Sequence, residues 1–370
     1  MKVGVFHWST GLAGGGEYLV HYLAKALDTK VYTIVQGENK YGFEDISHLL
    51  PPILKQLRYI RSLDYLCWSN IDVLDIDSFD VVITSGATAR ALIVPEDVMH
   101  VHYLHSPPRW LFDLWHWRRK QKSKILQTLI APLAEFFRIW DRAVDANVDY
   151  YFVNSPIIKQ RLWKYYKREG VVLYPPVECD KYEFKEYGDF YLHIGRLDPE
   201  KRVRLAVDAC LKAKRKLILI GIEGRDKETL KYVKKLSETS PYIEYLGYVS
   251  DKEKRKLLSE CRAVIYPPVA EDFGIVPIEA IASGKPVIVT DSGFPKVLVK
   301  QKRCGVIAKP AVDDIAKAIL ELEKIEWNPD ELRSKAREFD YETFKLHLHF
   351  WLKKWYDEFL GKIENCRVVL

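Results

Sequence analysis

The sequence lacks an apolar run that could cross a membrane. A transmembrane helix needs about 20 mostly apolar residues, and no stretch of this chain approaches that length. The beginning of the chain also lacks a secretory signal pattern, because the first residues lead straight into a run typical of a strand. We therefore expect a cytoplasmic protein, with a peripheral position on the inner face of the membrane as an alternative.

The sequence also lacks the cysteine spacing of a zinc site and the glycine spacing of a dinucleotide-binding loop. The six cysteines include no C-x-x-C pair and no neighbouring histidine cluster, so they predict isolated thiols rather than a zinc site or a disulfide framework. The glycine-rich residues 11–16 do not match the dinucleotide fingerprint G-x-G-x-x-G. This loop is either a tight turn or a segment whose bare backbone faces a ligand phosphate or an acceptor.

Length and charge favour a two-domain globular protein. A chain of 370 residues exceeds what one hydrophobic core usually supports. Hydrophobic residues at 48% and charged residues at 29% are typical of soluble globular proteins. The net charge of +6 favours an anionic partner, such as a sugar nucleotide or an acidic membrane, but does not determine the fold.

Strands and helices alternate in both halves of the chain, which predicts an α/β protein with parallel sheets covered on both faces. Pro175 and Pro176 separate the halves and can continue neither a helix nor a central strand, so we interpret them as a stiff hinge. The predicted strands are residues 2–8, 30–35, 79–84, 98–104 and 150–153 in the first half, and 190–194, 217–220, 242–246 and 262–266 in the second.

Residues 266–290 carry the most informative pattern. A buried strand ends there, a loop with Glu271 and Asp272 follows, and a short helix carries Glu279, with Pro277 suited to the first helical position. An isolated glutamate in a first helical turn is more often only a partner of the helix dipole. The flexible Gly274, however, lets backbone amides approach a ligand at the helix start, where amides suit phosphate or hydroxyl groups.

Two cations follow the first strand of the second half. Arg196 offers a rigid fork of donors and Lys201 a mobile point charge, a combination suited to a diphosphate. As isolated residues they would be solvated charges. In the first half, His105 follows the strand at 98–104, where a lone histidine is more often a structural hydrogen-bonding group than a catalyst, and we interpret His102 as structural.

The chain resembles the retaining glycosyltransferases of family 4, which have the two-domain GT-B fold. The resemblance is carried by Glu271-Asp272-Phe273-Gly274, Glu279-Ala280 and residues 282–287, together with His105-Ser106-Pro107. It implies two Rossmann-like parallel-sheet domains that face a central cleft, and a C-terminal helix that crosses back to the first domain. The expected domains are an acceptor domain at 1–176, a donor domain at 177–340 and a terminal helix at 341–370.

The resemblance also implies roles for individual residues. His105 faces the transferred sugar, Glu271 positions sugar hydroxyls, Glu279 binds the ribose, Arg196 and Lys201 bind the diphosphate, and the base is held through the backbone near Tyr248. The implied catalytic residues are His105, Glu271, Arg196 and Lys201. The implied donor-binding residues are Gly15, Gly16, Arg196, Lys201, Tyr248, Val249, Glu271, Asp272, Phe273, Gly274, Ile275 and Glu279.

The implied reaction is retaining transfer of a hexose, with mannose favoured, from a nucleotide diphosphate sugar such as GDP-mannose to a glycan or lipid-linked acceptor. No Asp-x-Asp metal clamp accompanies the donor loops, and positive side chains can stabilise the leaving diphosphate, so we expect no cofactor and no required metal. The alternatives are a UDP-sugar-dependent enzyme of the same fold, or a non-catalytic protein that binds a sugar nucleotide or a membrane.

Residues 110–142 combine aromatic and basic side chains. They include Trp110, Trp115, Trp117, Phe136, Phe137 and Trp140 beside Arg118, Arg119, Lys120, Lys122 and Lys124. One interpretation is a set of core aromatics with a solvated basic face, and the other is a patch that binds an anionic membrane surface. We do not expect nucleic acid as a partner, because no recognisable nucleic-acid motif accompanies the charge and the pI of about 8.7 is modest.

Overall fold

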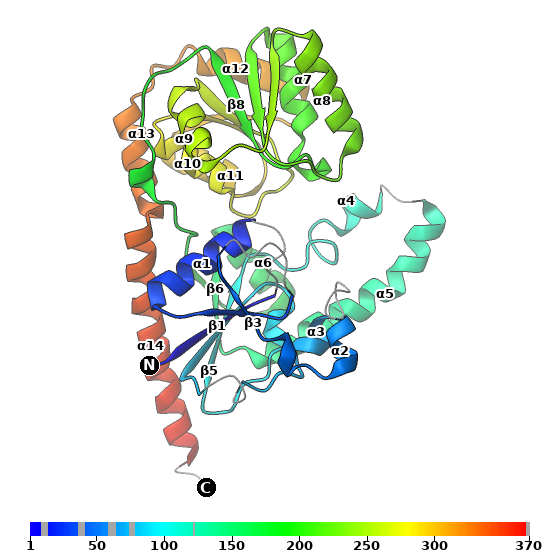
Figure 1. Cartoon of the computed structure of the whole chain (residues 1–370), viewed down its shortest axis with the longest axis vertical. Helices are drawn as coiled ribbons and strands as arrows, with labels where there is room; N and C mark the ends of the chain where they lie inside the picture. Colours follow the sequence, from blue (N-terminus) through cyan, green and yellow to red (C-terminus); the bar gives the residue numbers. More distant parts are fainter. Residues whose placement is uncertain (9–13, 36–40, 58–63, 74–77, 121–122, 368–370) are drawn as a thin grey trace. The chain divides into compact units, whose positions relative to one another are not determined.

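The structure, a computed structural model, describes residues 1–8, 14–35, 41–57, 64–73, 78–120 and 123–367. The chain divides into two compact units (Figure 1). Unit 1 comprises Met1–Pro175 and Phe344–Leu370, and unit 2 comprises Pro176–Thr343. The glycine-rich residues 11–13 lie outside the described residues.

Unit 1 is built on a parallel sheet with the strand order β3-β2-β1-β4-β5-β6-β7. The inner strands β1, β4 and β5 are buried along their whole length, as apolar strands covered on both faces should be. The strands are β1 (Val3–His7), β2 (Val31–Thr33), β3 (Glu44–Asp45), β4 (Val81–Ser85), β5 (Met99–Leu104), β6 (Tyr150–Val153) and β7 (Val171–Val172).

Helices follow most of these strands, as the alternating sequence pattern predicts. α6 is typical: Ser155 caps it by accepting from the backbone N–H of Ile158, and Pro156 occupies its first turn. The helices of unit 1 before residue 175 are α1 (Gly15–Leu27), α2 (Pro52–Leu57), α3 (Asp64–Trp68), α4 (Trp115–Arg119), α5 (Lys124–Ala143) and α6 (Pro156–Tyr166), with short 3-10 turns η1 (Ser47–Leu49), η3 (Ala89–Ala91) and η4 (Val144–Asn147).

The long C-terminal helix α14 (Tyr341–Arg367) packs on the sheet of unit 1. The Trp355 ring stacks on Tyr150 of β6 with ring centroids 4.9 Å apart, and His349 bonds the carbonyl oxygen of Ala26 in α1 at 2.9 Å. Phe344, Leu348 and Leu352 are buried along the same helix. The expected terminal helix that returns to the first domain is therefore confirmed.

Unit 2 repeats the same architecture with a parallel sheet in the order β10-β9-β8-β11-β12-β13. Its strands are β8 (Phe190–Ile194), β9 (Lys216–Ile220), β10 (Ile243–Gly247), β11 (Ala263–Tyr266), β12 (Val287–Thr290) and β13 (Gly305–Ala308). Its helices are α7 (Val203–Ala213), α8 (Lys227–Thr239), α9 (Asp251–Glu260), α10 (Ile275–Ala282), α11 (Gly293–Lys302), α12 (Val312–Leu322) and α13 (Pro329–Ala336), with 3-10 turns η5 (Cys179–Lys181), η6 (Pro199–Lys201) and η7 (Arg337–Phe339).

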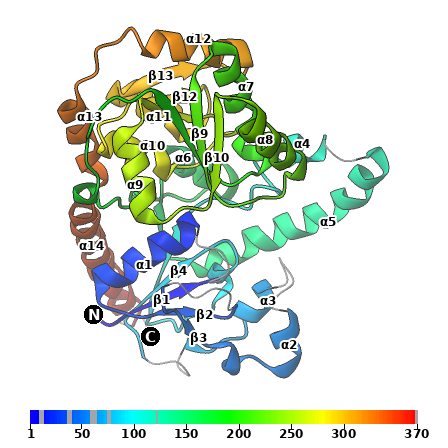
Figure 2. The ribbon, with the colours of Figure 1, turned by 45° about the horizontal axis from the view of Figure 1, so that its top comes forward.

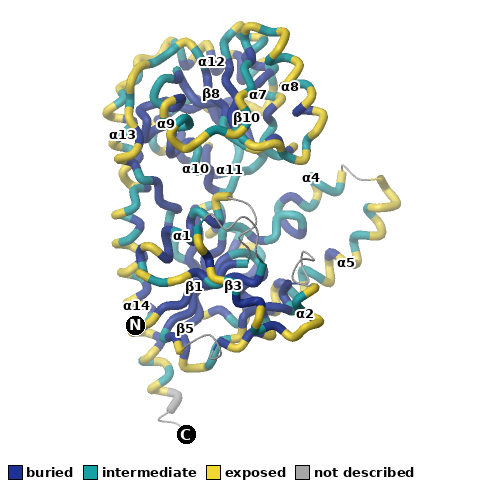
Figure 3. The backbone as a smooth tube through the Cα atoms, in the orientation of Figure 1, coloured by how far each residue is buried: buried dark blue, intermediate teal, exposed yellow. Residues whose placement is uncertain are grey.

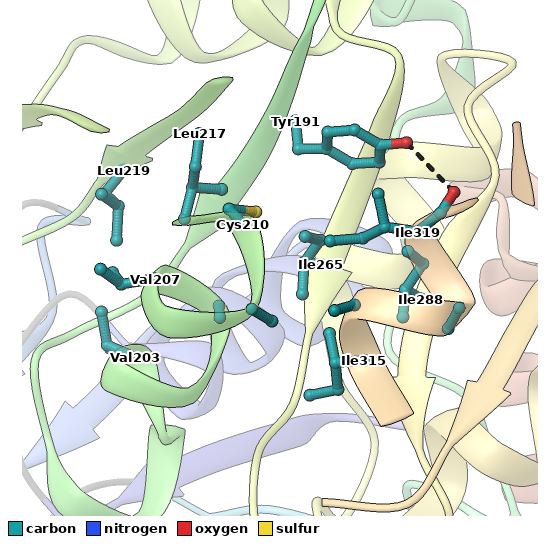
Figure 4. Close-up of a cluster of buried hydrophobic side chains, with 14 of the residues drawn as sticks. Tyr191, Val203, Val207, Cys210, Leu217, Leu219, Ile265, Ile288, Ile315 and Ile319 are labelled. Atoms are coloured by element: carbon teal, nitrogen blue, oxygen red, sulfur yellow. Dashed lines mark hydrogen bonds between the residues drawn. The ribbon is translucent and has the colours of Figure 1, made fainter. Parts of the chain in front are cut away.

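The core of unit 2 lies between this sheet and the helices α7 and α12. Figure 4 shows Val203, Val207 and Cys210 of α7 beside Leu217 and Leu219 of β9, with Ile315 and Ile319 of α12 next to β11 and β12. The Tyr191 hydroxyl donates to the carbonyl oxygen of Ile319 at 3.5 Å, which ties β8 to α12 (Figure 4). The inner strands are mostly dark blue in both units in Figure 3, as expected for sheets that form the interior.

Two further features of the described residues are the state of the cysteines and the hydropathy of the helices. Cys67, Cys179, Cys210, Cys261 and Cys304 are free and buried, and the side chain of Cys366 lies outside the described residues. Among the described residues, no helix is both long and apolar enough to span a bilayer.

Candidate functional site

The sheet of unit 2 has its topological switch point at β8. The chain moves from β8 outward to β9 and β10 on one side and later to β11, β12 and β13 on the other. Ligands of such sheets bind beyond the carboxyl ends of the strands where the order reverses. The loops after β8 and β11 meet at this edge, because the backbone N–H of Val269 donates to the carbonyl oxygen of Glu200 at 2.8 Å.

Lys201 and Glu271 form the centre of this edge. The Lys201 Nζ donates to the Glu271 Oε2 at 2.7 Å, and both side chains are about one-fifth exposed. Burial alone would lower the pKa of Lys201, but the adjacent carboxylate outweighs it and holds the pKa well above its usual value. Lys201 is therefore a permanent cation, and the Tyr266 ring lies below it at 5.8 Å from Nζ to centroid.

Arg196 joins this pair from the start of the same loop. Its guanidinium is about half exposed, and its Nε lies 3.3 Å from Oδ2 of Asp198. Its positive charge slightly opposes the rise in the pKa of Lys201, so the two cations lie within electrostatic range of each other. Asp198 is buried and also binds Arg225 at 3.2 Å; burial alone would raise its pKa, but these donors lower it. The structure thus brings together three predicted residues: Arg196, Lys201 and Glu271.

The loop that carries Glu271 has an unusual backbone. Ala270 adopts a φ of 45° and Gly274 a φ of 83°, values that L side chains rarely reach. Gly293 of α11 packs against the loop so closely that a Cβ there would lie 2.4 Å from the carbonyl oxygen of Glu271. The backbone N–H of Phe294 donates to that same oxygen at 2.9 Å. The start of α11 therefore fixes the backbone of Glu271.

The helix α10 begins earlier than the sequence suggested. Its first residue is Ile275, so Pro277 is the third helical residue and not the first, and Glu279 lies beyond the first turn. The cause is Gly274, which takes the N-cap position in a left-handed conformation, so that the helix begins at the next residue. The Phe273 side chain is buried and stacks on Phe294 at 5.3 Å, so it supports the loop and leaves only its backbone for a ligand.

Glu279 is buried and bound by two side chains that sequence reasoning missed. The Tyr182 hydroxyl and the Lys254 Nζ both donate to its Oε1 at 2.7 Å. Burial would lower the pKa of Lys254, but the attraction of Glu279 raises it above the usual value. No sequence signal distinguishes Lys254, since it is one of several charged residues in the run 251–256.

Tyr248 follows β10 at the same edge of the sheet. Its side chain is 73% exposed and borders an open hollow of about 570 Å³ at the ends of β9 and β10. The lining residues also include Gly221, Glu223, Lys234 and Tyr245. Gly221 is required there, because a Cβ would lie 2.2 Å from the carbonyl oxygen of Gly195. The predicted base contacts of Tyr248 and Val249 stay predictions.

In unit 1, the ends of three strands meet at His105. Its Nε2 lies 2.8 Å from the hydroxyl of Ser85, the last residue of β4, and its carbonyl oxygen accepts from the Asn154 amide after β6 at 2.9 Å. Burial lowers the pKa of His105 to about 4, so the ring is neutral near neutral pH. His102, by contrast, is fully buried within β5 and bonds Thr84 at 2.8 Å, a structural position.

Gly16 lies next to His105. A Cβ on Gly16 would be 3.9 Å from the His105 Nε2 and 3.7 Å from the His7 ring. Gly15 and Gly16 are not a loop, however: they form the first turn of α1, and the Glu17 carboxylate accepts from the backbone N–H of Gly14 at 3.1 Å. The buried His7, whose pKa burial lowers to about 3, was missed because it ends an ordinary apolar run.

The aromatic residues of segment 110–142 mostly face inward. Trp110, Trp115 and Phe137 pack against a buried cluster of unit 1, and Trp140 lies 5.4 Å from the Tyr65 ring. Phe136 is the exception, with 57% of its surface exposed.

No group of three potential metal ligands occurs in the part of the chain that the structure describes.

Three comparisons relate the chain to known proteins. Residues 178–342 match the family model described as glycosyl transferases group 1. The chain is 25% identical over 366 residues to the alpha-1,3/1,6-mannosyltransferase ALG2 of Kluyveromyces lactis, covering 80% of this chain and 70% of the relative. It is 23% identical over 286 residues to ALG2 of Dictyostelium discoideum, with 63% and 68% covered.

Solved structures agree at the level of the fold. Anabaena Alr3699/HepE in complex with UDP superposes with a TM-score of 0.72 at 17% identity, covering 96% of this chain and 100% of that chain. The glycosyltransferase WaaG superposes with a TM-score of 0.69 at 14% identity, covering 97% of this chain and 100% of that chain. With its two parallel sheets and its group 1 domain at 178–342, the chain is a glycosyltransferase of the GT-B fold.

Proposed function

We propose that the protein transfers a hexose, with mannose favoured, from a nucleotide diphosphate sugar to a glycan or lipid-linked acceptor, with retention of the anomeric configuration and without a required metal. The observation that carries the proposal is the contact of Lys201 with Glu271 beside Arg196 at the switch point of unit 2. The mannosyltransferases among the relatives favour mannose, and GDP-mannose is the donor we expect.

The leaving group of this reaction explains the two cations. Cleavage of the bond to the diphosphate develops negative charge on its oxygens, and preorganised positive side chains stabilise such charge. Lys201 remains protonated because Glu271 raises its pKa, so it can neutralise the diphosphate at any physiological pH. Arg196 adds a planar fork of donors suited to phosphate oxygens.

Glu271 offers the complementary chemistry. Its carboxylate can accept hydrogen bonds from sugar hydroxyls. It lies 2.7 Å from the Lys201 ammonium, which supports the proposal that both ends of the donor bind at one site. The backbone of Glu271 is fixed by the unusual conformation of Ala270 and by the close packing of Gly293. A carboxylate held in a fixed orientation toward its substrate lowers the activation barrier of the reaction. We propose that Glu279 binds the ribose and that attack occurs on the same face as departure.

Replacement of Glu271 tests the proposal. Glu271→Ala should reduce transfer from GDP-mannose by about a hundredfold or more, since oriented polar contacts contribute several kcal/mol to a transition state, while GDP still raises the melting temperature. The matched control is Glu260→Ala: Glu260 also binds a lysine at 2.7 Å, but it precedes β11 at the opposite edge of the sheet. Turnover of Glu271→Ala equal to that of Glu260→Ala would refute the assignment.

The melting-temperature measurement also tests which nucleotide sugar is the donor. Melting temperatures measured with GDP, UDP and ADP sugars rank the donors, because a ligand that binds only the folded state raises stability with its affinity. A larger shift with a UDP sugar would select the UDP-dependent alternative. Binding of a donor without release of nucleotide diphosphate in the presence of any acceptor would select the non-catalytic alternative. The anomeric configuration of the product separates retention from inversion.

A further inference from the structure

The helix α5 exposes an apolar stripe that the transfer reaction does not use. Five large side chains are 54–77% exposed along it: Ile125, Leu129, Leu133, Phe136 and Ile139. Their spacing of three or four residues places them on one face of the helix, which we call the outer stripe. A contiguous exposed apolar patch on a soluble protein commonly marks an interaction surface.

The opposite face of α5 already has its partners in unit 1. Ala134 is fully buried, the Arg138 Nε donates to the carbonyl oxygen of Leu111 at 2.7 Å, and Asp141 forms a buried ion pair with Arg90. Phe137 packs against Trp110 with centroids 5.8 Å apart. The core contacts of α5 thus come from the face opposite the outer stripe. The outer stripe is therefore not needed for the packing of unit 1.

The N-terminal half of α5 projects away from the sheet of unit 1. None of the residues 123–133 is buried, whereas the anchoring contacts lie at 134–143. Figures 1 and 2 show the helix extending outward with this end farthest from the strands, and Figure 3 marks most of its length as exposed or intermediate. The side chains of the projecting half therefore lie outside the core of unit 1.

The charges near the outer stripe indicate which kind of partner surface the stripe can bind. The sequence from 114 to 134 contains no aspartate or glutamate but five cations: Arg118, Arg119, Lys120, Lys122 and Lys124. Within α5, Glu135 is the exposed carboxylate, and Arg138 already pairs with it at 2.8 Å. A second copy docked stripe to stripe would bring the same cationic segment, whose residues 114–134 include no acid to compensate the charge. Anionic lipid headgroups supply the missing charge, while their acyl chains accept the apolar side chains.

We propose that the outer stripe of α5 docks on an anionic lipid surface, with the helix lying along that surface. The stripe spans fifteen residues from Ile125 to Ile139, or about 22 Å of helix, and sinks into the boundary between headgroups and acyl chains. The cationic segment before it contacts the headgroups. This proposal stands on the helix alone and does not depend on the proposed reaction, although it would bring the enzyme to lipid-linked acceptors.

Sedimentation of the full chain with vesicles tests the proposal. The wild-type protein should bind vesicles of phosphatidylcholine mixed with phosphatidylglycerol, bind pure phosphatidylcholine more weakly, and dissociate as salt rises. Leu129→Ser with Phe136→Ser should weaken binding by about tenfold or more, because two embedded side chains are lost. Both positions are exposed, so folding, checked by thermal unfolding, should be preserved.

A matched control comes from α14. Leu346 and Phe350 are 70% and 61% exposed, close to the 69% and 57% of Leu129 and Phe136. Leu346→Ser with Phe350→Ser should bind vesicles like the wild type. Absence of wild-type binding to anionic vesicles, or equal loss in both double variants, would overturn the proposal. A dimer in solution that Leu129→Ser with Phe136→Ser dissolves, without vesicle binding, would identify a second copy as the occupant instead.

Discussion

The Glu279 carboxylate is held by residues from two other segments of unit 2. Lys254 comes from α9 and Tyr182 follows η5, and each lies 2.7 Å from the same carboxylate oxygen. Because Glu279 is 6% exposed, removal of one partner leaves a buried charge with incomplete hydrogen bonding. Lys254 thus supports the fold and at the same time fixes the orientation of a residue that we assign to the ribose.

Lys254→Met should therefore destabilise the protein by about 1–3 kcal/mol, measured as the free energy of unfolding in urea. Lys256→Met is the control on the same helix: Lys256 is 61% exposed and lies 3.8 Å from Glu253, so the change should be within about 0.5 kcal/mol. Equal effects of the two substitutions would show that the contact with Glu279 contributes nothing beyond an ordinary surface pair.

At the scale of elements, α11 supports the loop that carries Glu271. Gly293 begins this helix with a φ of 75°, and the loop backbone occupies the place of a side chain. Gly293→Ala should cost about 2 kcal/mol or more of unfolding free energy, since it adds both backbone strain and a clash with the carbonyl oxygen of Glu271. Transfer activity should fall as well, because Glu271 must move.

Gly361 provides the opposite case for the same substitution. It lies inside α14, and a Cβ there would meet nothing within 4 Å. Gly361→Ala should stabilise the protein by about 0.5–1 kcal/mol through the helix propensity of alanine. Thermal unfolding of both variants tests the pair of predictions. A neutral Gly293→Ala would mean that the loop can rearrange without loss of stability.

The elements themselves were largely predictable from the sequence. The runs 150–153 and 190–194 coincide with β6 and β8, because short apolar runs that are buried on both faces have few other solutions. The start of α10 was misplaced by two residues, since Pro277 indicated a first position while Gly274 determined it. The pairing of Lys201 with Glu271 was not predictable, because it joins residues 70 positions apart through the strand order.

At the scale of the whole molecule, buried histidines are concentrated in unit 1. Burial lowers the pKa of His7 to about 3 and those of His100 and His105 to about 4, and it also lowers the pKa of His102. In unit 2, His193 is affected in the same way, with a pKa of about 4. Each of these rings is neutral in the folded protein and gains a proton more readily when unfolded.

The sign of the pH dependence follows from these values. Between the unfolded pKa of about 6.5 and a folded pKa near 4, the unfolded state binds more protons, so stability is fully present above this window and falls as the pH falls through it. The loss amounts to about 1 kcal/mol per histidine between about pH 7 and about pH 5.5. Burial also raises the pKa values of Asp145 and Asp149, which acts in the opposite direction, but these two groups stand against four buried histidines in unit 1.

Acid should therefore weaken unit 1 more than unit 2. Hydrogen exchange, corrected for the intrinsic exchange rate and measured at about pH 7 and about pH 5.5, should show a larger loss of protection in β1, β4 and β5 than in β8 and β11. His193→Gln should leave the loss in unit 1 unchanged, since this ring lies in the sheet of unit 2. If the two sheets lose protection equally, or if unit 2 opens first, then desolvation of the unit 1 histidines does not determine the acid response of this protein.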